Sequence, residues 1–219
     1  MAAMSCPVFL VRHGQSEWNV ARLTQGQTPH PRLTDVGRHQ AAQAATRLST
    51  VLADAEPVLV SSDLVRARET ADVIALLLGV SVSEDVRLRE QALGRLEGRP
   101  YEETWAAAEA HDWSDPSLPV AGGESPADVY DRMAGAMDDA RVMARERPVI
   151  LVSHGDAIRA ALAYARGVGP HAGEWIEVPN GVVLRVTGGE VAPVREAPIV
   201  APDGVGVGAT PGFVERFDR

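Results

Sequence analysis

Two histidines of this chain stand in the same local setting. His13 lies just beyond the apolar run of residues 8–11, His154 lies just beyond the apolar run of residues 149–152, and each histidine is followed by a glycine. A continuous apolar run of this length is typical of a buried parallel strand. Because ligands bind at the carboxyl ends of the strands in an open α/β sheet, we expect both histidines to meet in one pocket.

The segment Arg12-His13-Gly14, with Ser16 and Asn19 behind it, resembles the signature of the histidine phosphatase superfamily, the phosphoglycerate mutase-like proteins. Four further blocks are similar to those of the family and follow in its order: residues 61–71, residues 88–90 with Gly94, Glu97 and Gly98, residues 122–125, and residues 153–155. A lone Arg-His-Gly is common by chance. Five blocks in order across residues 8–166 make a specific match.

The resemblance implies phosphoryl transfer through a phosphohistidine. At the matching positions His13 is the nucleophile, Arg12 and Arg66 bind the phosphate, His154 stabilises charge on the phosphoryl group, and Asn19 donates an uncharged hydrogen bond to it. Arginine suits this task because its fixed fork of donors fits phosphate oxygens. The other residues expected to line the phosphate and substrate site are Gly14, Gln25, Gly26 and Gly155.

Glu90 matches the proton donor of the family. A partly desolvated carboxyl near phosphate has a raised pKa, so it can protonate the departing alkoxide and then take a proton from water. Glu97 is the alternative acid. The family has a structural glutamate at that position, in a Gly-x-x-Glu-Gly turn, so we prefer Glu90.

Alternating strand and helix patterns predict an α/β three-layer sandwich with a mostly parallel central sheet, as the resemblance also implies. Residues 14–33 are expected to form a long loop over the pocket, and residues 91–124 a lid-like segment. Strands are expected at residues 8–11, 58–60, 80–86 and 149–152, with a strand pair within 176–195. Helices are expected at about 35–52, from Ser62 or Asp63 to Leu78, at about 101–110, from Ser125 to about Glu146, and at about 156–166.

Length and composition favour one globular domain. The chain has 219 residues, of which 45% are hydrophobic and 23% charged, which suits a single domain at residues 1–197. Residues 198–219 are rich in Gly, Pro and Val without a period, which predicts a mobile tail. No apolar stretch approaches the roughly 20 residues that span a bilayer, and no secretory leader is evident, so we expect a cytoplasmic protein without a membrane partner.

Charge and motifs narrow the partners. The net charge of −9 and a pI near 5.1 argue against nucleic-acid binding, which requires a basic face. No metal is expected, because the sequence lacks a His-Glu-x-x-His motif and a cysteine cluster. No cofactor is expected either, because the glycines form neither a dinucleotide nor a P-loop fingerprint. The expected partner is a small phosphorylated metabolite; the oligomeric state stays open.

Three functions remain in view, and a phosphomonoesterase is our first choice. A phosphoglycerate mutase of this family carries extra basic residues in the lid to hold the substrate carboxylate, whereas residues 100–124 contain no Arg or Lys. The aromatic and imidazole side chains there form either an apolar substrate wall or simple lid packing: Tyr101, Trp105, His111 and Trp113. A catalytically idle protein that binds phosphorylated ligands is the third possibility, against which the retained histidines, arginines and Glu90 argue.

Overall fold

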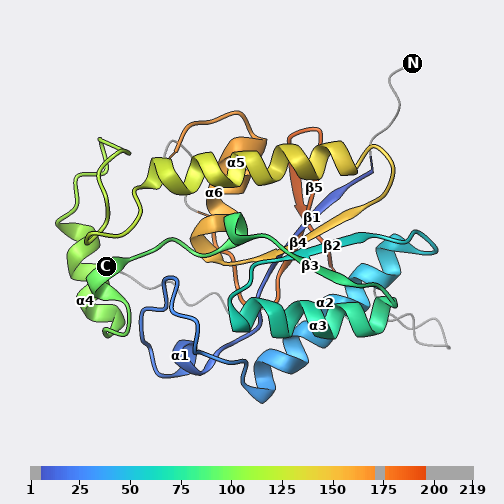
Figure 1. Cartoon of the computed structure of the whole chain (residues 1–219), viewed down its shortest axis with the longest axis horizontal. Coiled ribbons are helices and arrows are strands. Elements are labelled where there is room, and N and C mark those ends of the chain that lie inside the picture. The colour runs from blue at the N-terminus through green and yellow to red at the C-terminus, as the bar shows by residue number, and fades with distance from the viewer. Residues whose placement is uncertain (1–5, 171–175, 196–219) are drawn as a thin grey trace, which may run out of the picture.

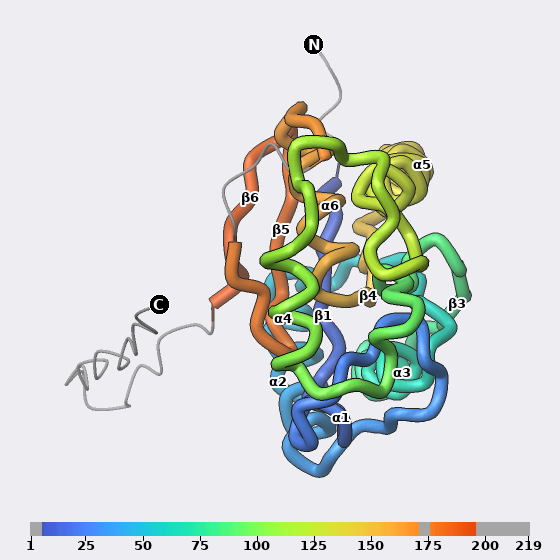
Figure 2. Tube along the Cα trace, turned by 90° about the vertical axis from the view of Figure 1, so that its left-hand side faces the viewer, coloured from blue at the N-terminus to red at the C-terminus, as the bar shows by residue number. Residues whose placement is uncertain are grey.

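The computed structural model describes residues 6–170 and 176–195. The tail expected at residues 198–219 lies outside the described residues. Within them, the strands are β1 (Val8–Arg12), β2 (Val58–Ser61), β3 (Val82–Glu84), β4 (Val149–Ser153), β5 (Val183–Thr187) and β6 (Glu190–Pro193). They form one six-stranded sheet in the order β3-β2-β4-β1-β5-β6, and Figure 2 shows β6 and β3 at its opposite edges.

The sheet is mixed but mostly parallel. Strands β1 and β2 both pair with β4 in parallel, and β3 pairs with β2 in the same way. Strand β5 runs antiparallel to β1, and β6 forms a hairpin with β5. The expected strand pair is therefore confirmed, with its turn at Gly188 and Gly189.

Helices cover both faces of the sheet, which confirms the expected three-layer sandwich. The helices of the described residues are α1 (Glu17–Val20), α2 (Asp35–Leu52), α3 (Val65–Leu78), α4 (Tyr101–Glu109), α5 (Pro126–Met143) and α6 (Gly155–Ala165). Figure 1 shows α2 and α3 along one face and α5 along the other, whereas α4 and α1 lie beyond one end of the strands. No helix in the described part of the chain is long and apolar enough to cross a bilayer.

The alternation of side chains along β1 explains the two packing layers. Phe9 packs in the cluster with the apolar faces of α2 and α3, whereas Leu10 packs in the cluster with α5 and α6. Successive side chains of a strand point to opposite faces, so a strand that is apolar throughout can be covered on both. The histidine-bearing strands β1 and β4 are central for this reason.

Helix starts were predicted well where one polar side chain caps the helix. Thr34 accepts a hydrogen bond from the Gly37 N–H at the start of α2, and Ser125 forms a capping box with Asp128 at the start of α5. Such caps satisfy N–H groups that have no partner within the helix.

The predicted cap of α3 was wrong. This helix begins at Val65, after Leu64, without a side-chain cap. Ser62 instead contacts His154, and Asp63 pairs with Arg89, so tertiary contacts use both side chains. At its other end α3 stops at Gly79, which has φ +69° as expected of a helix-ending glycine.

Two other boundaries differ from expectation, and short helical turns occur in segments expected to be loops. Helix α5 ends at Met143 rather than near Glu146, and β3 covers only part of residues 80–86. The loop at residues 14–33 contains the one-turn helix α1, whose capping box pairs Ser16 with Asn19. One short 3₁₀ turn, Val86–Leu88, lies just before the lid-like segment, and a second, Gly94–Leu96, lies within it.

Candidate active site

Strand register brings the two histidines together. Arg12 of β1 pairs with Ser153 of β4, so the residues that follow, His13 and His154, lie side by side. The His13 N–H donates to the Ser153 carbonyl at 3.0 Å, and the ring centroids are 5.1 Å apart. Both side chains are buried. The expected meeting of the two histidines at the carboxyl end of the sheet is confirmed.

The His13 ring is oriented by its own loop. Its Nδ1 lies 2.7 Å from the Gly14 carbonyl oxygen, which can only accept, so Nδ1 carries the proton in this contact. In the neutral ring Nε2 then holds a lone pair. The pKa of His13 is well below its usual value, because burial and the nearby charges of Arg66 and Arg12 disfavour the imidazolium. His13 is thus a neutral imidazole at pH 7.

Arg66 is a buried cation rather than a solvated residue on a helix face. It is fully buried in the first turns of α3, where Nη2 donates to the Gly26 carbonyl at 2.8 Å and Nη1 to the Thr28 carbonyl at 3.0 Å. Burial lowers its pKa to about 10, so the side chain remains charged at pH 7. By contrast, Arg68 pairs with Asp72 near the surface.

Several donors of the site face no protein acceptor. Arg12 donates from Nη1 to the Val178 carbonyl at 2.5 Å. Within the described residues, however, Nε of Arg12, Nε of Arg66 and Nδ1 of His154 are buried without a hydrogen-bond partner. Buried polar groups are nearly always paired. A group of buried nitrogens on two cations and an imidazole fits an anion with several acceptor oxygens.

Glu90 places its carboxyl group at the first turn of α6. Oε1 accepts hydrogen bonds from the N–H groups of Gln91 at 3.0 Å, Asp156 at 3.1 Å and Ala157 at 3.1 Å. Oε2 accepts a longer bond of 3.4 Å from Asp156. Because Oε1 is heavily used as an acceptor, Oε2 is the better place for a proton.

Two effects raise the pKa of Glu90. Burial is the larger, and the negative charge of Asp156 adds to it; the Gln91 N–H, Arg12 and Arg66 act in the opposite direction. A bound phosphate would add further negative charge and favour the protonated carboxyl. The sequence-based preference for Glu90 as the acid therefore has an electrostatic basis.

Glu97 has a different place in the molecule. Its carboxylate accepts from the N–H groups of Gln27 and Leu93, each at 3.0 Å, and from the Thr28 hydroxyl at 3.2 Å. A side chain at Gly26, which has φ +48°, would meet Glu97 Oε1 at 2.2 Å. Glu97 thus holds the loop whose carbonyls bind Arg66, in agreement with the structural role expected for it.

Gly14 has a packing role in the structure, and its expected contact with the ligand stays a prediction. Its N–H donates to the Thr70 hydroxyl at 3.1 Å, and a Cβ at this position would lie 2.2 Å from the Gly37 carbonyl oxygen. Glycine is therefore required here for close packing of the loop against α2. Gly155 differs, because its missing side chain leaves space between Arg12 and Glu90.

Asn19 and Gln25 are joined through Ser16. Asn19 Oδ1 accepts from the Ser16 N–H at 2.9 Å, and Gln25 Oε1 accepts from the Ser16 hydroxyl at 2.8 Å. The amide nitrogen of Asn19 lies 3.3 Å from the Tyr101 hydroxyl, so in this structure it contacts the lid-like segment. The amide nitrogen has two N–H donors, so donation to a phosphoryl group does not require loss of this contact.

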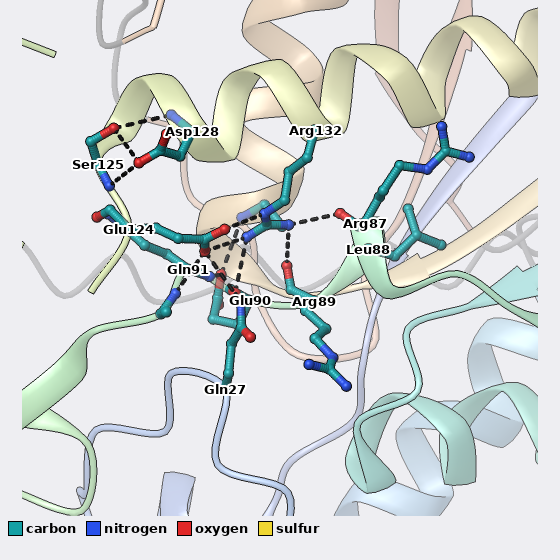
Figure 3. A network of polar contacts seen from close by, with 12 residues as sticks. Gln27, Arg87, Leu88, Arg89, Glu90, Gln91, Glu124, Ser125, Asp128 and Arg132 are labelled. Atoms are coloured by element: carbon teal, nitrogen blue, oxygen red, sulfur yellow. Dashed lines mark hydrogen bonds and ion pairs between the residues drawn. The ribbon is translucent and has the colours of Figure 1, made fainter. Parts of the chain in front are cut away.

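Sequence reasoning missed the residues that support Glu90. Figure 3 shows the side chain of Arg132 in α5, which points toward the backbone of the segment that ends at Glu90. The same side chain also contacts Glu124. The Arg132 guanidinium contacts both oxygens of Glu124 at 2.8 and 2.9 Å. Gln27 Nε2 contacts the Glu90 carbonyl at 3.0 Å and Glu124 at 3.2 Å. Glu124 belongs to a recognised block, but no motif pointed to Arg132 or Gln27.

Ser62, expected only as a candidate helix cap, also contacts the site. Its hydroxyl lies 2.9 Å from Nε2 of His154, and it accepts from the Leu64 N–H at 3.3 Å. Ser62 thereby orients the second histidine of the pocket. The pKa of His154 is well below its usual value, chiefly because of burial and the charge of Arg66.

The aromatic residues of the lid-like segment lie in two settings, one at the surface and one at a cavity. Trp105 is 53% exposed and packs near Arg22 and Tyr101. Trp113 contacts His111 and lines a cavity between α5 and α6. A substrate-facing apolar wall at Trp113 stays a prediction. The described part of the chain holds no group of three or more His, Cys, Asp or Glu side chains placed to bind a metal ion.

The fold and these residues define an α/β protein of the phosphoglycerate mutase-like class. A family model described as the histidine phosphatase superfamily (branch 1) matches residues 8–195. The chain belongs to this superfamily.

Relatives within the superfamily carry different names. The chain is 36% identical over 185 residues to a probable phosphoglycerate mutase GpmB of Serratia proteamaculans, covering 82% of this chain and 83% of that protein. It is 30% identical to a mycobacterial glucosyl-3-phosphoglycerate phosphatase solved with VO3, with a TM-score of 0.70 and coverage of 83% and 90%. A phosphoserine phosphatase mutant from Entamoeba histolytica shares the fold at 23% identity, with a TM-score of 0.71 and coverage of 87% and 95%.

Proposed function

We propose that the chain is a phosphomonoesterase that hydrolyses a small phosphorylated metabolite through a phosphohistidine on His13. The observation that carries this proposal is the 2.7 Å contact between His13 Nδ1 and the Gly14 carbonyl. It leaves the lone pair on Nε2, beside the buried guanidinium groups of Arg12 and Arg66. A phosphoryl group held there faces a nucleophile and fixed positive charge together.

In the first step the Nε2 lone pair of His13 attacks phosphorus, and the bond from phosphorus to the ester oxygen breaks in line. The proton on Oε2 of Glu90 moves to the departing oxygen. Arg12 and Arg66 neutralise the equatorial oxygens. When the Ser62 hydroxyl donates to Nε2 of His154, the ring proton lies on Nδ1. His154 then donates from Nδ1 to the phosphoryl group.

In the second step water attacks the phosphohistidine. Its proton moves to the Glu90 carboxylate, the bond between nitrogen and phosphorus breaks, and inorganic phosphate leaves. His13 and protonated Glu90 are restored, so the cycle balances with water as the second reactant. This chain's own cations supply the positive charge that the transition state requires, and the route uses no cofactor.

The test is trapping of the phosphoenzyme. We expect the wild-type chain incubated with labelled phosphoester to carry an acid-labile, base-stable label, and the His13→Ala variant to carry none. Turnover of p-nitrophenyl phosphate should be lost in the same variant. Undiminished labelling without His13 would show that the nucleophile lies elsewhere. A protein that binds vanadate but never turns over any ester would instead be the catalytically idle relative.

A phosphoglycerate mutase is the second candidate, and the names of the curated relatives favour it. A mutase must bind the carboxylate of phosphoglycerate. Residues 100–124 supply no cation for it, and Arg159, which α6 brings near Glu90, is paired with Asp156 at 2.7 Å. We therefore expect phosphate release to exceed exchange between 2- and 3-phosphoglycerate primed by bisphosphoglycerate. Fast primed exchange with little free phosphate would reverse this order.

A further inference from the structure

A cavity of about 380 Å³ lies between α5, α6 and the lid-like segment. Much of its wall is apolar and includes Trp113, Val129, Ala160, Ala163 and Ile176. Cavities of a few hundred Å³ with such walls are the usual form of small-molecule sites.

Three side chains of this wall use their polar atoms in hydrogen bonds within the protein. The Tyr130 hydroxyl donates to the Val168 carbonyl at 2.9 Å, and Gln91 Nε2 donates to the Glu124 carbonyl at 2.9 Å. The Trp113 ring N–H donates to the Ala108 carbonyl at 2.8 Å. The polar atoms in these three bonds already have partners within the protein.

The cavity adjoins the proposed general acid. Gln91, which directly follows Glu90, and Asp156, whose N–H binds the Glu90 carboxyl, both belong to the cavity wall. A side chain built at Gly155 would lie 3.4 Å from Nη1 of Arg159, 3.6 Å from Oε2 of Glu90 and 3.7 Å from Cζ of Arg12. Arg159 also lines the cavity. The space around Gly155 therefore joins the phosphate-binding Arg12 to the edge of the cavity.

The geometry of the proposed reaction places the leaving group next to this cavity. In-line attack by His13 places the departing oxygen on the far side of phosphorus, next to the acid that protonates it. The organic part of the ester must then lie on the Glu90 side, where the cavity begins. We propose that this cavity is the leaving-group subsite and takes the apolar alkyl or aryl part of a phosphomonoester. The inference rests on the phosphomonoesterase proposed above and names its substrate class.

Two arginines, Arg159 and Arg166, and the carboxylate of Asp156 also line the cavity. The Arg159 guanidinium pairs with Asp156 at 2.7 Å and donates from Nε to the Ile176 carbonyl at 2.9 Å. A leaving group with a carboxylate would have to compete with Asp156 for this cation. An alkyl or aryl group has no such competitor and gains from removal of its surface from water.

Alkylphosphonates test the subsite without any turnover, because their carbon–phosphorus bond is not hydrolysed. We expect the dissociation constant, measured by calorimetry from methyl- to hexylphosphonate, to fall by about fourfold per methylene until the cavity is filled. Benzylphosphonate should bind more tightly than methylphosphonate. A dissociation constant that does not change with chain length would overturn the subsite.

Two variants locate the effect. Ala163→Phe fills the cavity from α6, so it should remove most of the chain-length dependence while binding of methylphosphonate changes by less than about twofold. Trp113→Ala removes part of the wall at the surface and should weaken the dependence without a large effect on folding. Ala42→Phe, at a half-buried alanine of α2, is the matched control. Full chain-length dependence in both cavity variants would place the alkyl group elsewhere and reject the assignment.

Turnover separates this inference from the proposed function. Hydrolysis of methyl and p-nitrophenyl phosphate, together with phosphonate binding that is independent of chain length, would keep the phosphatase and reject the apolar subsite. Binding that strengthens with chain length, without turnover of any ester, would keep the subsite and reject the phosphatase. Tighter binding of the phosphonate analogue of phosphoserine or phosphoglycerate than of hexylphosphonate would also reject an apolar leaving group.

Discussion

Arg132 of α5 donates a hydrogen bond from Nη2 to the backbone carbonyl of Glu90 at 3.0 Å. The same guanidinium donates from Nη1 to the carbonyls of Arg87 at 2.7 Å and Arg89 at 2.6 Å. Its other contacts are with Glu124, as Figure 3 shows. One side chain of α5 thus holds the segment that carries the proposed acid.

Arg132→Lys tests whether this contact positions Glu90. Lysine has a compact charge and cannot bind three carbonyls and a carboxylate in one plane. We expect single-turnover phosphorylation of His13 to slow by about 10- to 100-fold with an alkyl phosphate, because small displacements of an acid are costly. The loss should be much smaller with p-nitrophenyl phosphate, whose leaving group needs no proton.

A double-mutant cycle distinguishes positioning from a general loss of structure. In the Glu90→Gln background Arg132→Lys should add little, because the acid on which it acts is already absent. Arg68→Lys is the control, since Arg68 also contacts two carboxylates but at the surface of α3. Additive losses, equal for both esters, would show that Arg132 serves the fold alone.

Glu90→Gln removes the proposed proton donor. General-acid catalysis contributes about 10²–10⁴-fold, so phosphorylation by an alkyl phosphate should slow by that factor and phosphorylation by p-nitrophenyl phosphate far less. Single-turnover kinetics are required, because Glu90 is also proposed to activate water in the second step. Glu97→Gln should disturb the loop that holds Arg66 and affect both esters alike. The reverse pattern would assign the acid to Glu97.

The pH dependence of the first step follows from two opposite requirements. The pKa of His13 is lowered, so its lone pair persists below pH 6.5, where an ordinary histidine becomes protonated. The pKa of Glu90 is raised, so its protonated fraction grows as pH falls. We expect phosphorylation by an alkyl phosphate to accelerate from about pH 8 to about pH 6. The Glu90→Gln variant should not show this acceleration. A wild-type phosphorylation rate that decreases as the pH is lowered would contradict both assignments.

Buried neutral histidines also make stability depend on pH. Below pH 6.5 the unfolded chain binds protons at His13 and His154 that the folded chain does not bind, so the free energy of unfolding falls as pH decreases. Each such group contributes up to about 1.4 kcal/mol per pH unit. The raised pKa of Glu90 acts in the opposite direction, because the folded chain then retains a proton above the ordinary pKa of a glutamate.

Urea unfolding between about pH 7.5 and about pH 5.5 measures this effect. The loss of stability should be smaller in His154→Asn than in the wild type, because one proton-linked group is gone. His39→Asn, at an exposed position of α2, is the matched control. If His154→Asn follows the wild-type curve, the imidazole of His154 does not stay neutral in the folded state.

Chelation tests the source of positive charge. We expect turnover to persist in excess EDTA, because the buried Arg66 and the half-buried Arg12 carry the charge at the site themselves. Vanadate should inhibit, since its five-coordinate form resembles the transition state. Activity that disappears with EDTA and returns with Mg²⁺ or Zn²⁺ would require a metal in the reaction.

Local patterns in the sequence determined the frame of the site. The apolar runs at residues 8–11 and 149–152 specify buried strands, because only strands covered on both faces tolerate such composition. The capping residues Thr34 and Ser125 specify where two long helices begin. The hydroxyl of the residue just before a helix can accept hydrogen bonds from the free N–H groups of its first turn. These signals act within a few residues, and they also sufficed to place His13 and His154 at one edge of the sheet.

Contacts between distant segments decided the rest. Ser62 and Asp63 look like helix caps, but His154 and Arg89 use their side chains, so α3 starts later. Gly14 looks like a ligand-facing glycine, but Gly37 of α2 lies against it. The contact of Arg132 with the Glu90 carbonyl and the cavity between α5 and α6 depend on how helices pack across the sheet. Local sequence does not determine such contacts, because they form only when separate helices and strands pack into one interior.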